Sequence, residues 1–204
     1  GTPTRARGYP PFEGSNSLII EVAPGLAIER IIDLALKSVP SVEPGILFVE
    51  RQFGVLELHS NDADEVNAVS ERLKPHRMRV GYHNHTSDFN RIDGEYWWNR
   101  FADQTSKDVI LQFDTGNASE MQGVTPQSLI TRNAGRTITM HVKPFSKKDP
   151  NAYLGADELD WPAIMSAAET VGGIEWYIIE YEKEGVPPLV SLAANLKAVK
   201  KLRS

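Results

Sequence analysis

Cysteine is absent from the 204-residue sequence. Its absence excludes disulfides, thiolate metal ligands and cysteine nucleophiles, so any metal site must use imidazole and carboxylate groups. A reducing compartment fits this composition best, and we expect a cytoplasmic protein. The alternative is an exported protein that has lost its signal, because residues 1–17 are polar and contain no apolar signal-peptide core.

Long apolar runs and a basic surface pattern are also lacking. No stretch approaches the roughly 18 uninterrupted apolar residues of a membrane-spanning helix. The net charge is −5, and the basic residues are scattered except at 196–204, which does not suit a nucleic-acid backbone. We therefore expect neither a membrane nor a nucleic-acid partner, and a small molecule as the ligand.

The first third of the chain gives a mixed pattern. Residues 18–23 suit a short strand, and the helical spacing of Ile28, Ile31 and Leu36 predicts a helix that Pro40 stops. The apolar runs 46–49 and 55–59 lie too close together for a parallel crossover. Either they form a hairpin, or the first run is the end of a helical segment.

From residue 55 onward, segments with the alternating apolar residues of a strand are followed by segments with the apolar spacing of a helix. Helix starts are indicated by Asn61 or Asp62 as a cap, and by Asp160 before Trp161-Pro162. This alternation is typical of a parallel α/β sheet. Strands are predicted at 55–59, 79–85, 109–114, 137–143 and 176–181.

Each predicted strand from residue 79 onward ends in polar groups. Period-two geometry places His83 and His85 on one face, and the same parity applies to the later strands. Parallel α/β folds place their sites at this edge. The groups concerned are His83, His85, Gln112, Asp114, His141, Lys143 and Glu180.

The fold class predicted is α/β, a (β/α)8 TIM-barrel-like fold whose N-terminal third is incomplete or rearranged. One face of the strands is polar or small, as at Gly81 and Thr139, which suits a barrel lumen better than an open sheet. No glycine-rich phosphate loop follows any predicted strand. We expect an N-terminal arm over residues 1–17 and a single domain over 18–204, with regular βα units over 55–204.

The motifs at these strand ends resemble those of the sugar phosphate isomerase/epimerase family of xylose-isomerase-like (β/α)8 barrels. The resemblance covers about residues 55–204, and the order and approximate spacing of the motifs match. It rests on Gly81-Tyr82-His83-Asn84-His85 with Asp88-Phe89, on Asp114-Thr115-Gly116-Asn117, on His141-Val142-Lys143, and on Trp161-Pro162-Ala163-Ile164 with Trp176-Tyr177-Ile178-Ile179-Glu180.

The resemblance implies one divalent metal ion, Mn, Zn, Co or Mg, held at the ends of the strands. Asp114, His141 and Glu180 match the family's ligand positions directly. The first ligand is either His83, which strand parity favours, or Asp88. Imidazole and carboxylate donors suit these metals.

The family also implies an activity. We expect an enzyme, an isomerase or epimerase of a small sugar or sugar phosphate in carbohydrate metabolism, working through a metal-stabilised enediolate. Glu180 is the first choice of acid/base and His85 the second, while Lys143 would hold a phosphate or carboxylate or polarise the carbonyl. A lyase or dehydratase on a keto-sugar or keto-inositol, and a non-catalytic sugar-binding protein, are the alternatives.

Further side chains are expected to contact the sugar substrate: Gln112, Asn117, Trp97 and His59. For His59 and Trp97 a purely structural role is the competing interpretation. Since only 80 residues precede Gly81, three ordinary βα units do not fit before it. An open barrel would expose a strand edge, so we expect a homo-oligomer or a rearranged N-terminus.

Overall fold

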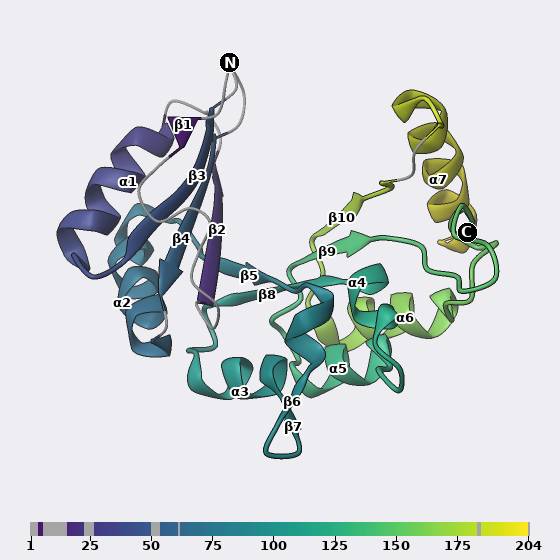
Figure 1. The fold of residues 1–204 in the computed structure, drawn as a ribbon, viewed down its shortest axis with the longest axis horizontal. Coiled ribbons are helices and arrows are strands. Elements are labelled where there is room, and N and C mark those ends of the chain that lie inside the picture. The colour runs from purple at the N-terminus through teal and green to yellow at the C-terminus, as the bar shows by residue number, and fades with distance from the viewer. Residues whose placement is uncertain are drawn as a thin grey trace. The chain divides into compact units, whose positions relative to one another are not determined.

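The computed structural model describes residues 4–5, 16–22, 27–49, 54–60, 62–182 and 185–203. Its contacts divide the chain into two compact units (Figure 1). The first unit comprises Gly1–His83 and Phe101–Ile110, and the second comprises Asn84–Arg100 and Leu111–Ser204. This division does not coincide with the expected arm over 1–17 and single domain over 18–204.

The first unit is an antiparallel sheet with helices packed on it. Neighbouring strands run in the order β1-β3-β4-β2-β5, and each adjacent pair is antiparallel. Figure 1 shows α1 and α2 on the same side of this sheet. The elements are β1 (Thr4–Arg5), β2 (Asn16–Val22), α1 (Ala27–Ser38), β3 (Glu43–Val49), β4 (Gly54–Ser60), α2 (Ala63–Leu73), the 3-10 turn η1 (Lys74–His76) and β5 (Gly81–His83).

The sequence accounts for both helices of the first unit. On α1, Ile28 and Ile31 are buried at helical spacing, as predicted. At the start of α2 the Asp62 carboxylate accepts a hydrogen bond of 2.8 Å from the backbone N–H of Asp64, which confirms the expected cap. Val66 and Leu73 form part of the buried face of α2.

The hairpin interpretation of the runs 46–49 and 55–59 is confirmed, because β3 and β4 pair antiparallel. The order β2-α1-β3-β4-α2-β5 is the split βαβ arrangement of ferredoxin-like folds. The prediction of βα barrel units from residue 55 is therefore wrong for β4, which pairs with β2 and β3 rather than with a parallel neighbour.

The second unit contains a parallel sheet of β8, β9 and β10. The structure confirms the α/β class and the parallel sheet here, but no closed barrel is formed by the described residues. Its elements are η2 (Thr86–Phe89), β6 (Arg91–Ile92), β7 (Glu95–Tyr96), α3 (Trp97–Gln104), β8 (Ile110–Asp114), α4 (Thr115–Glu120), α5 (Pro126–Arg132), β9 (Thr139–Val142), α6 (Trp161–Ala167), the π-helical turn η3 (Ala168–Gly172), β10 (Trp176–Ile179) and α7 (Pro188–Leu202).

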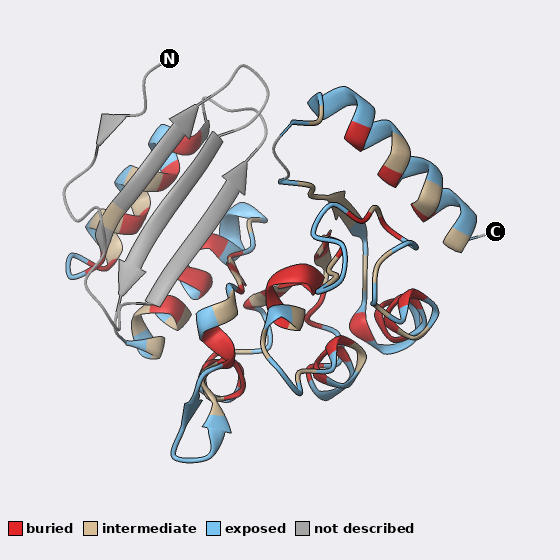
Figure 2. Ribbon diagram, turned by 45° about the vertical axis from the view of Figure 1, so that its right-hand side comes forward, coloured by how far each residue is buried: buried red, intermediate tan, exposed pale blue. Residues whose placement is uncertain are grey.

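Aromatic side chains fill the core beside β8. The rings of Phe89, Trp98 and Phe113 lie 5.9–6.3 Å apart, and all three side chains are buried. Leu111 and Met140 are buried on the faces predicted to be apolar, so the strand parity is confirmed there. Figure 2 shows the buried residues along the inner sides of the helices. Among the described helices, none combines the length and the apolar character needed to cross a membrane.

Candidate functional site

The parallel register of the second unit brings three predicted site residues to one edge of its sheet. Asp114 at the end of β8 is level with His141 on β9. Ile179 of β10 is level with Val142, so Glu180 follows directly beyond the strand. Because parallel strands end at the same edge, these polar side chains converge.

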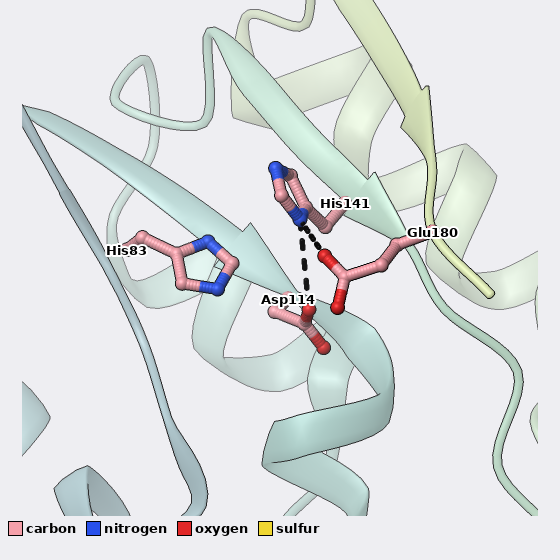
Figure 3. A group of neighbouring side chains, drawn as sticks. All are labelled: His83, Asp114, His141 and Glu180. Carbon is pink, nitrogen blue, oxygen red and sulfur yellow. Dashed lines mark hydrogen bonds and ion pairs between the residues drawn. The ribbon is translucent and has the colours of Figure 1, made fainter. Parts of the chain in front are cut away.

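The convergence is close enough for a common ligand. His141 Nδ1 lies 3.7 Å from Asp114 Oδ2 and is hydrogen-bonded to Glu180 Oε2. His83, the residue immediately before the second unit begins, completes the group (Figure 3). One ligand atom from each of His83, Asp114, His141 and Glu180 lies within 4.8 Å of the others.

The Asp114 backbone is held in place by Asn84, a fully buried residue that was not among the predicted site residues. The Asn84 Oδ1 atom accepts a 2.7 Å hydrogen bond from the N–H of Asp114, and Asn84 Nδ2 donates to the Asp114 carbonyl at 3.1 Å. The Asp114 carboxylate in turn accepts a 2.7 Å bond from the N–H of Asn117 and caps α4. In the sequence, the position of Asn84 between His83 and His85 at the end of a predicted strand could have indicated that it belongs to the site.

Burial and charge both act on the Asp114 carboxyl. Burial raises its pKa from 3.8 to about 7, and the nearby negative charge of Glu180 acts in the same direction. The hydrogen bond from Asn117 opposes this shift without cancelling it. The Asp114 carboxyl is therefore only partly ionised at neutral pH, and a further positive charge nearby would favour its ionised form.

The pKa of the Glu180 carboxyl is shifted in the opposite direction. Burial alone would raise the pKa of its carboxyl, but hydrogen bonds from His141 and Lys143 outweigh burial and hold the pKa well below its usual range. Glu180 is thus an anion at neutral pH, placed beside both a histidine ring and an ammonium group.

Lys143 joins the predicted residues into one network. Its Nζ donates to Glu180 Oε1 and Glu182 Oε2, both at 2.8 Å, and to Asn117 Oδ1 at 3.1 Å. Burial lowers the pKa of the Lys143 ammonium, but its carboxylate partners outweigh burial and raise the pKa above its usual range. Lys143 is therefore positively charged at neutral pH, and its ammonium group is held by hydrogen bonds to Glu180, Glu182 and Asn117.

Asp88, the alternative first ligand, lies outside this group. Its buried carboxylate accepts a 2.8 Å hydrogen bond from the backbone N–H of His85 at the start of η2. The side chain of His85 is exposed. The geometry thus associates His83, rather than Asp88, with Asp114, His141 and Glu180.

The predicted substrate contacts are dispersed. Asn117 belongs to the Lys143 network, whereas Gln112 lies on β8 and donates to Thr139 Oγ1 at 2.9 Å. Trp97 is half-buried at the start of α3. His59 lies on β4, and its side chain is outside the described residues.

Two further contributors besides Asn84 were missed in the sequence analysis. The Thr115 hydroxyl donates to the carbonyl of Lys143 at 2.8 Å and accepts from its N–H at 3.0 Å, which ties α4 to the end of β9. Glu182 supplies an exposed carboxylate to Lys143. Thr115 directly follows Asp114 and could have been found from that position, but Glu182 follows β10 without a recognisable pattern.

Comparison with known proteins gives two different likenesses. The model of the CsoS1D N-terminal domain family matches residues 1–76. The carboxysome shell protein CsoS1D of Hydrogenovibrio crunogenus is 32% identical over 138 residues, which is 66% of this chain. The chain spans 63% of the length of that relative.

Among solved structures, a double-ringed trimeric shell protein from the RMM microcompartment is 57% identical over 38% of this chain and 41% of its own, with a TM-score of 0.33. This shell protein is thus an oligomer by its description. A sugar phosphate isomerase/epimerase from Parabacteroides distasonis is 21% identical, covers 68% of this chain and 50% of its own, and has a TM-score of 0.59. At that identity the second likeness is one of fold alone.

These findings correct the functional prediction. The matching family model and the curated relative are carboxysome shell proteins, which are structural components and not enzymes of carbohydrate metabolism. The prediction of a metal-dependent isomerase or epimerase is therefore wrong, together with the alternatives given with it. The resemblance to the isomerase/epimerase family is confirmed only as a likeness of fold: solved structures of a sugar phosphate isomerase/epimerase and of L-ribulose 3-epimerase are similar over most of the chain, but the described residues form no closed barrel.

Proposed function

We propose that this chain is a component of a protein shell of the microcompartment kind, with residues 1–76 as its assembling module. The observation that carries the proposal is the match of these residues to the CsoS1D N-terminal domain family. The first unit supports it, because residues 16–76 contain two helices on one side of an antiparallel sheet. A shell consists of many copies, so the expected homo-oligomer and a location inside the cell belong to the same proposal.

Co-assembly tests this proposal. The full chain, mixed with the purified carboxysome shell protein CsoS1D, should enter particles that electron microscopy and sedimentation detect. Val69→Asp, which buries a charge at a position 1% exposed, should abolish co-assembly. Ala68→Asp places the same charge on the exposed side of α2 and should retain it. A chain that stays monomeric at every concentration and never enters such particles contradicts the proposal.

A second proposal concerns the cluster at the sheet edge. We infer that His83, Asp114, His141 and Glu180 bind one divalent ion. Two imidazole nitrogens and two carboxylates form a donor set suited to Zn, Mn or Co, with Mg less well matched. A bound ion would favour the ionised form of the buried Asp114 carboxyl, in the same direction as the charges of Lys143 and His141. It would also tie the ends of separate strands together, which is a structural role compatible with a shell component.

Metal analysis tests the second proposal separately from the first. Protein prepared without chelator should contain about one divalent ion per chain. Asp114→Ala and His83→Ala should each lose the ion, whereas Asp88→Asn should keep it, because Asp88 lies outside the group. Retention of metal by Asp114→Ala would contradict the assignment, and loss in Asp88→Asn with retention in His83→Ala would transfer the first ligand to Asp88.

A further inference from the structure

Glu180 differs from the other proposed ligands of the second unit in how its backbone is held. Asp114 and His141 belong to strands β8 and β9, whereas Glu180 follows the last residue of β10. Its backbone N–H donates to the Val142 carbonyl at 3.3 Å, which is longer than the usual length of about 2.9–3.0 Å. His141 and Lys143 bind its carboxylate. The position of the Glu180 main chain therefore depends on the residues that come after it.

Tyr181, the next residue, attaches this segment to the loop of residues 144–159, which lies between β9 and α6. The Tyr181 hydroxyl donates a 2.7 Å hydrogen bond to the Asn151 carbonyl. Its ring stacks on that of Tyr153, with the ring centroids 5.0 Å apart and an angle of 22° between the planes. Stacked aromatic rings prefer a defined relative orientation. The residue directly after Glu180 is thus attached to the loop at two points.

The loop of residues 144–159 is braced by the Asp157 carboxylate. Asp157 Oδ2 accepts a 3.1 Å hydrogen bond from the backbone N–H of Phe145, near the start of the loop. Asp157 Oδ1 accepts from the N–H of Gly155 at 3.0 Å and from the indole N–H of the buried Trp161 at 2.7 Å. These bonds hold the start of the loop against its end, so a shift at one point of the loop also moves the others.

Helix α7 holds the same loop next to Tyr153. Asn195 of α7 is fully buried, and its Oδ1 accepts a 3.0 Å hydrogen bond from the backbone N–H of Leu154. Asn195 Nδ2 donates to the Ser191 carbonyl at 2.9 Å, which fixes the orientation of the side chain. Leu154 is also buried, so removal of the Asn195 amide would leave a buried N–H without its acceptor. Since Leu154 directly follows Tyr153, α7 determines where the ring that supports Tyr181 lies.

Apolar burial contributes little to the attachment of α7. Two of its three buried residues are polar, Ser191 and Asn195, and the third is Val199. Its exposed large side chains are Leu189, Val190, Leu192 and Leu196. Figure 2 shows exposed positions along the outer side of α7 and buried ones along its inner side. The hydrogen bond between Asn195 and Leu154 therefore contributes a large share of the contact between α7 and the loop.

We propose that Asn195 and Tyr181 are positioning residues for the metal ligand Glu180, so that the packing of α7 sets the affinity of the metal site. The proposal rests on the metal binding proposed above and names its regulation. Neither residue belongs to the donor group: Asn195 acts through the loop, and Tyr181 acts through the backbone it shares with Glu180. Groups that orient metal ligands typically change metal affinity by about 10–100-fold. Because coupling between two binding events is reciprocal, a bound ion favours the packed position of α7 by the same factor.

Zinc titration of the full chain tests the proposal. Asn195→Ala should lower the affinity for Zn²⁺ about tenfold, measured by competition with a chromophoric chelator. Asn133→Ala is the matched control, because Asn133 is also buried and its side chain donates to the carbonyl four residues earlier, that of Leu129, at 3.0 Å. Asn133 lies between α5 and β9, and its replacement should leave the affinity for Zn²⁺ within about twofold of the wild-type value.

Tyr181→Ala is a second variant with the same purpose. Tyr181 is partly exposed, so its replacement preserves the fold and tests the proposal even where Asn195→Ala unfolds. It should also lower the affinity for Zn²⁺ about tenfold. Since both residues act through the same contacts, the double variant should lose about tenfold and not about a hundredfold. Multiplied losses would show that the two residues act separately, and would overturn the proposal.

Amide hydrogen exchange measures the reciprocal effect. Saturating Zn²⁺ should slow exchange in α7 of the wild-type chain by up to about tenfold, and this protection should be lost in Tyr181→Ala. Wild-type affinity in Asn195→Ala, or exchange in α7 that ignores Zn²⁺, would overturn this inference and leave the metal site intact. A wild-type chain that binds no Zn²⁺ would contradict the metal site itself, and this inference with it.

Discussion

At the scale of single residues, the side chain of Asp114 takes part in three features of the site. Its carboxylate caps α4 through the N–H of Asn117, lies 3.7 Å from the ring nitrogen of His141, and belongs to the group of possible metal ligands. It is also fully buried. These demands conflict when no cation is bound, because a buried carboxylate beside Glu180 is unfavourable in its charged form.

The conflict predicts a pH dependence of the free energy of unfolding. The pKa of Asp114 is about 7 in the folded protein against 3.8 ordinarily, so the folded state binds the extra proton between these values. Stability of the chelator-treated protein should therefore fall as pH rises from about 4 to about 7, by up to about 4 kcal/mol, and then level off. Urea unfolding at about pH 5 and about pH 7.5 measures the difference.

Asp114→Asn is the control for this pH dependence. It keeps an acceptor for the N–H of Asn117 but does not titrate, so most of the slope should disappear. Glu180 does not mask the effect in this range: its lowered pKa gives stability that is lost only below its ordinary value, near 4.5. A slope that is the same in both proteins would show that another group is responsible.

Asn84 supports a second prediction at the residue scale. Asn84→Ala removes both side-chain partners of the Asp114 backbone and leaves buried N–H and C=O groups unsatisfied. The free energy of unfolding should fall by about 2–4 kcal/mol. Asn90→Ala is the control, because Asn90 is exposed, and it should change stability by about 0.5 kcal/mol or less. Comparable losses in the two variants would show that the Asn84 bonds contribute little.

At the scale of elements, the contact between α4 and the end of β9 determines how Lys143 is directed. A Cβ at Gly116 would lie 2.6 Å from Lys143 Cγ, which is closer than real Cβ contacts. Glycine at position 116 therefore allows the Lys143 side chain to approach α4 closely, and it is not needed for backbone flexibility. Thr115 reinforces the same contact through the backbone of Lys143.

A double-mutant cycle tests this element contact. Gly116→Ala should lower the free energy of unfolding by about 1–3 kcal/mol, despite the better helix propensity of alanine, because it displaces the Lys143 side chain. In a Lys143→Ala background the same change should cost clearly less, because the contacts with Cγ at 2.6 Å and Cδ at 2.9 Å disappear and only the one with Cβ at 3.0 Å remains. Equal effects of Gly116→Ala in both backgrounds, measured by urea unfolding, would rule out the contact as the cause.

The elements themselves were predictable to a considerable degree. Apolar spacing identified α1 and α2, the Asp62 and Asp160 caps are confirmed, and strand parity correctly separated Leu111 and Phe113 from Gln112. These features depend on local chain geometry. The choice between a hairpin and a helical end for residues 46–49 could not be made from the sequence, since it depends on pairing between β3 and β4.

At the scale of the whole molecule, the chain contains two units with different strand arrangements. The antiparallel sheet of the first unit and the parallel sheet of the second are each consistent with a different set of similar proteins. The error in the functional prediction has its origin here. The resemblance was assigned to residues 55–204, and the N-terminal third was interpreted as an incomplete or rearranged part of the same barrel, whereas residues 1–76 match the CsoS1D N-terminal domain family.

Metal binding should act unequally on the two units. A bound ion stabilises the state that binds it, by about 2.7 kcal/mol at 100 times the dissociation constant. Saturating Mn or Zn should therefore slow amide exchange in β8, α4 and β9, and leave α1 and α2 unchanged. Hydrogen exchange measured by mass spectrometry resolves these segments, and Asp114→Ala is the control. Equal protection of α1 and β9 would indicate coupling of the two units in place of a local metal effect.

The sequence by itself determined the local elements, the parity of the strands and the candidate donors, because these follow from short-range periodicity and side-chain chemistry. It also excluded thiolate chemistry outright. Only the tertiary structure decided that β2, β3 and β4 pair antiparallel, that His83 and not Asp88 joins the donor group, and that α7 exposes leucines. The physical reason is that pairing, burial and convergence are long-range properties, set by which segments meet and not by any one segment alone.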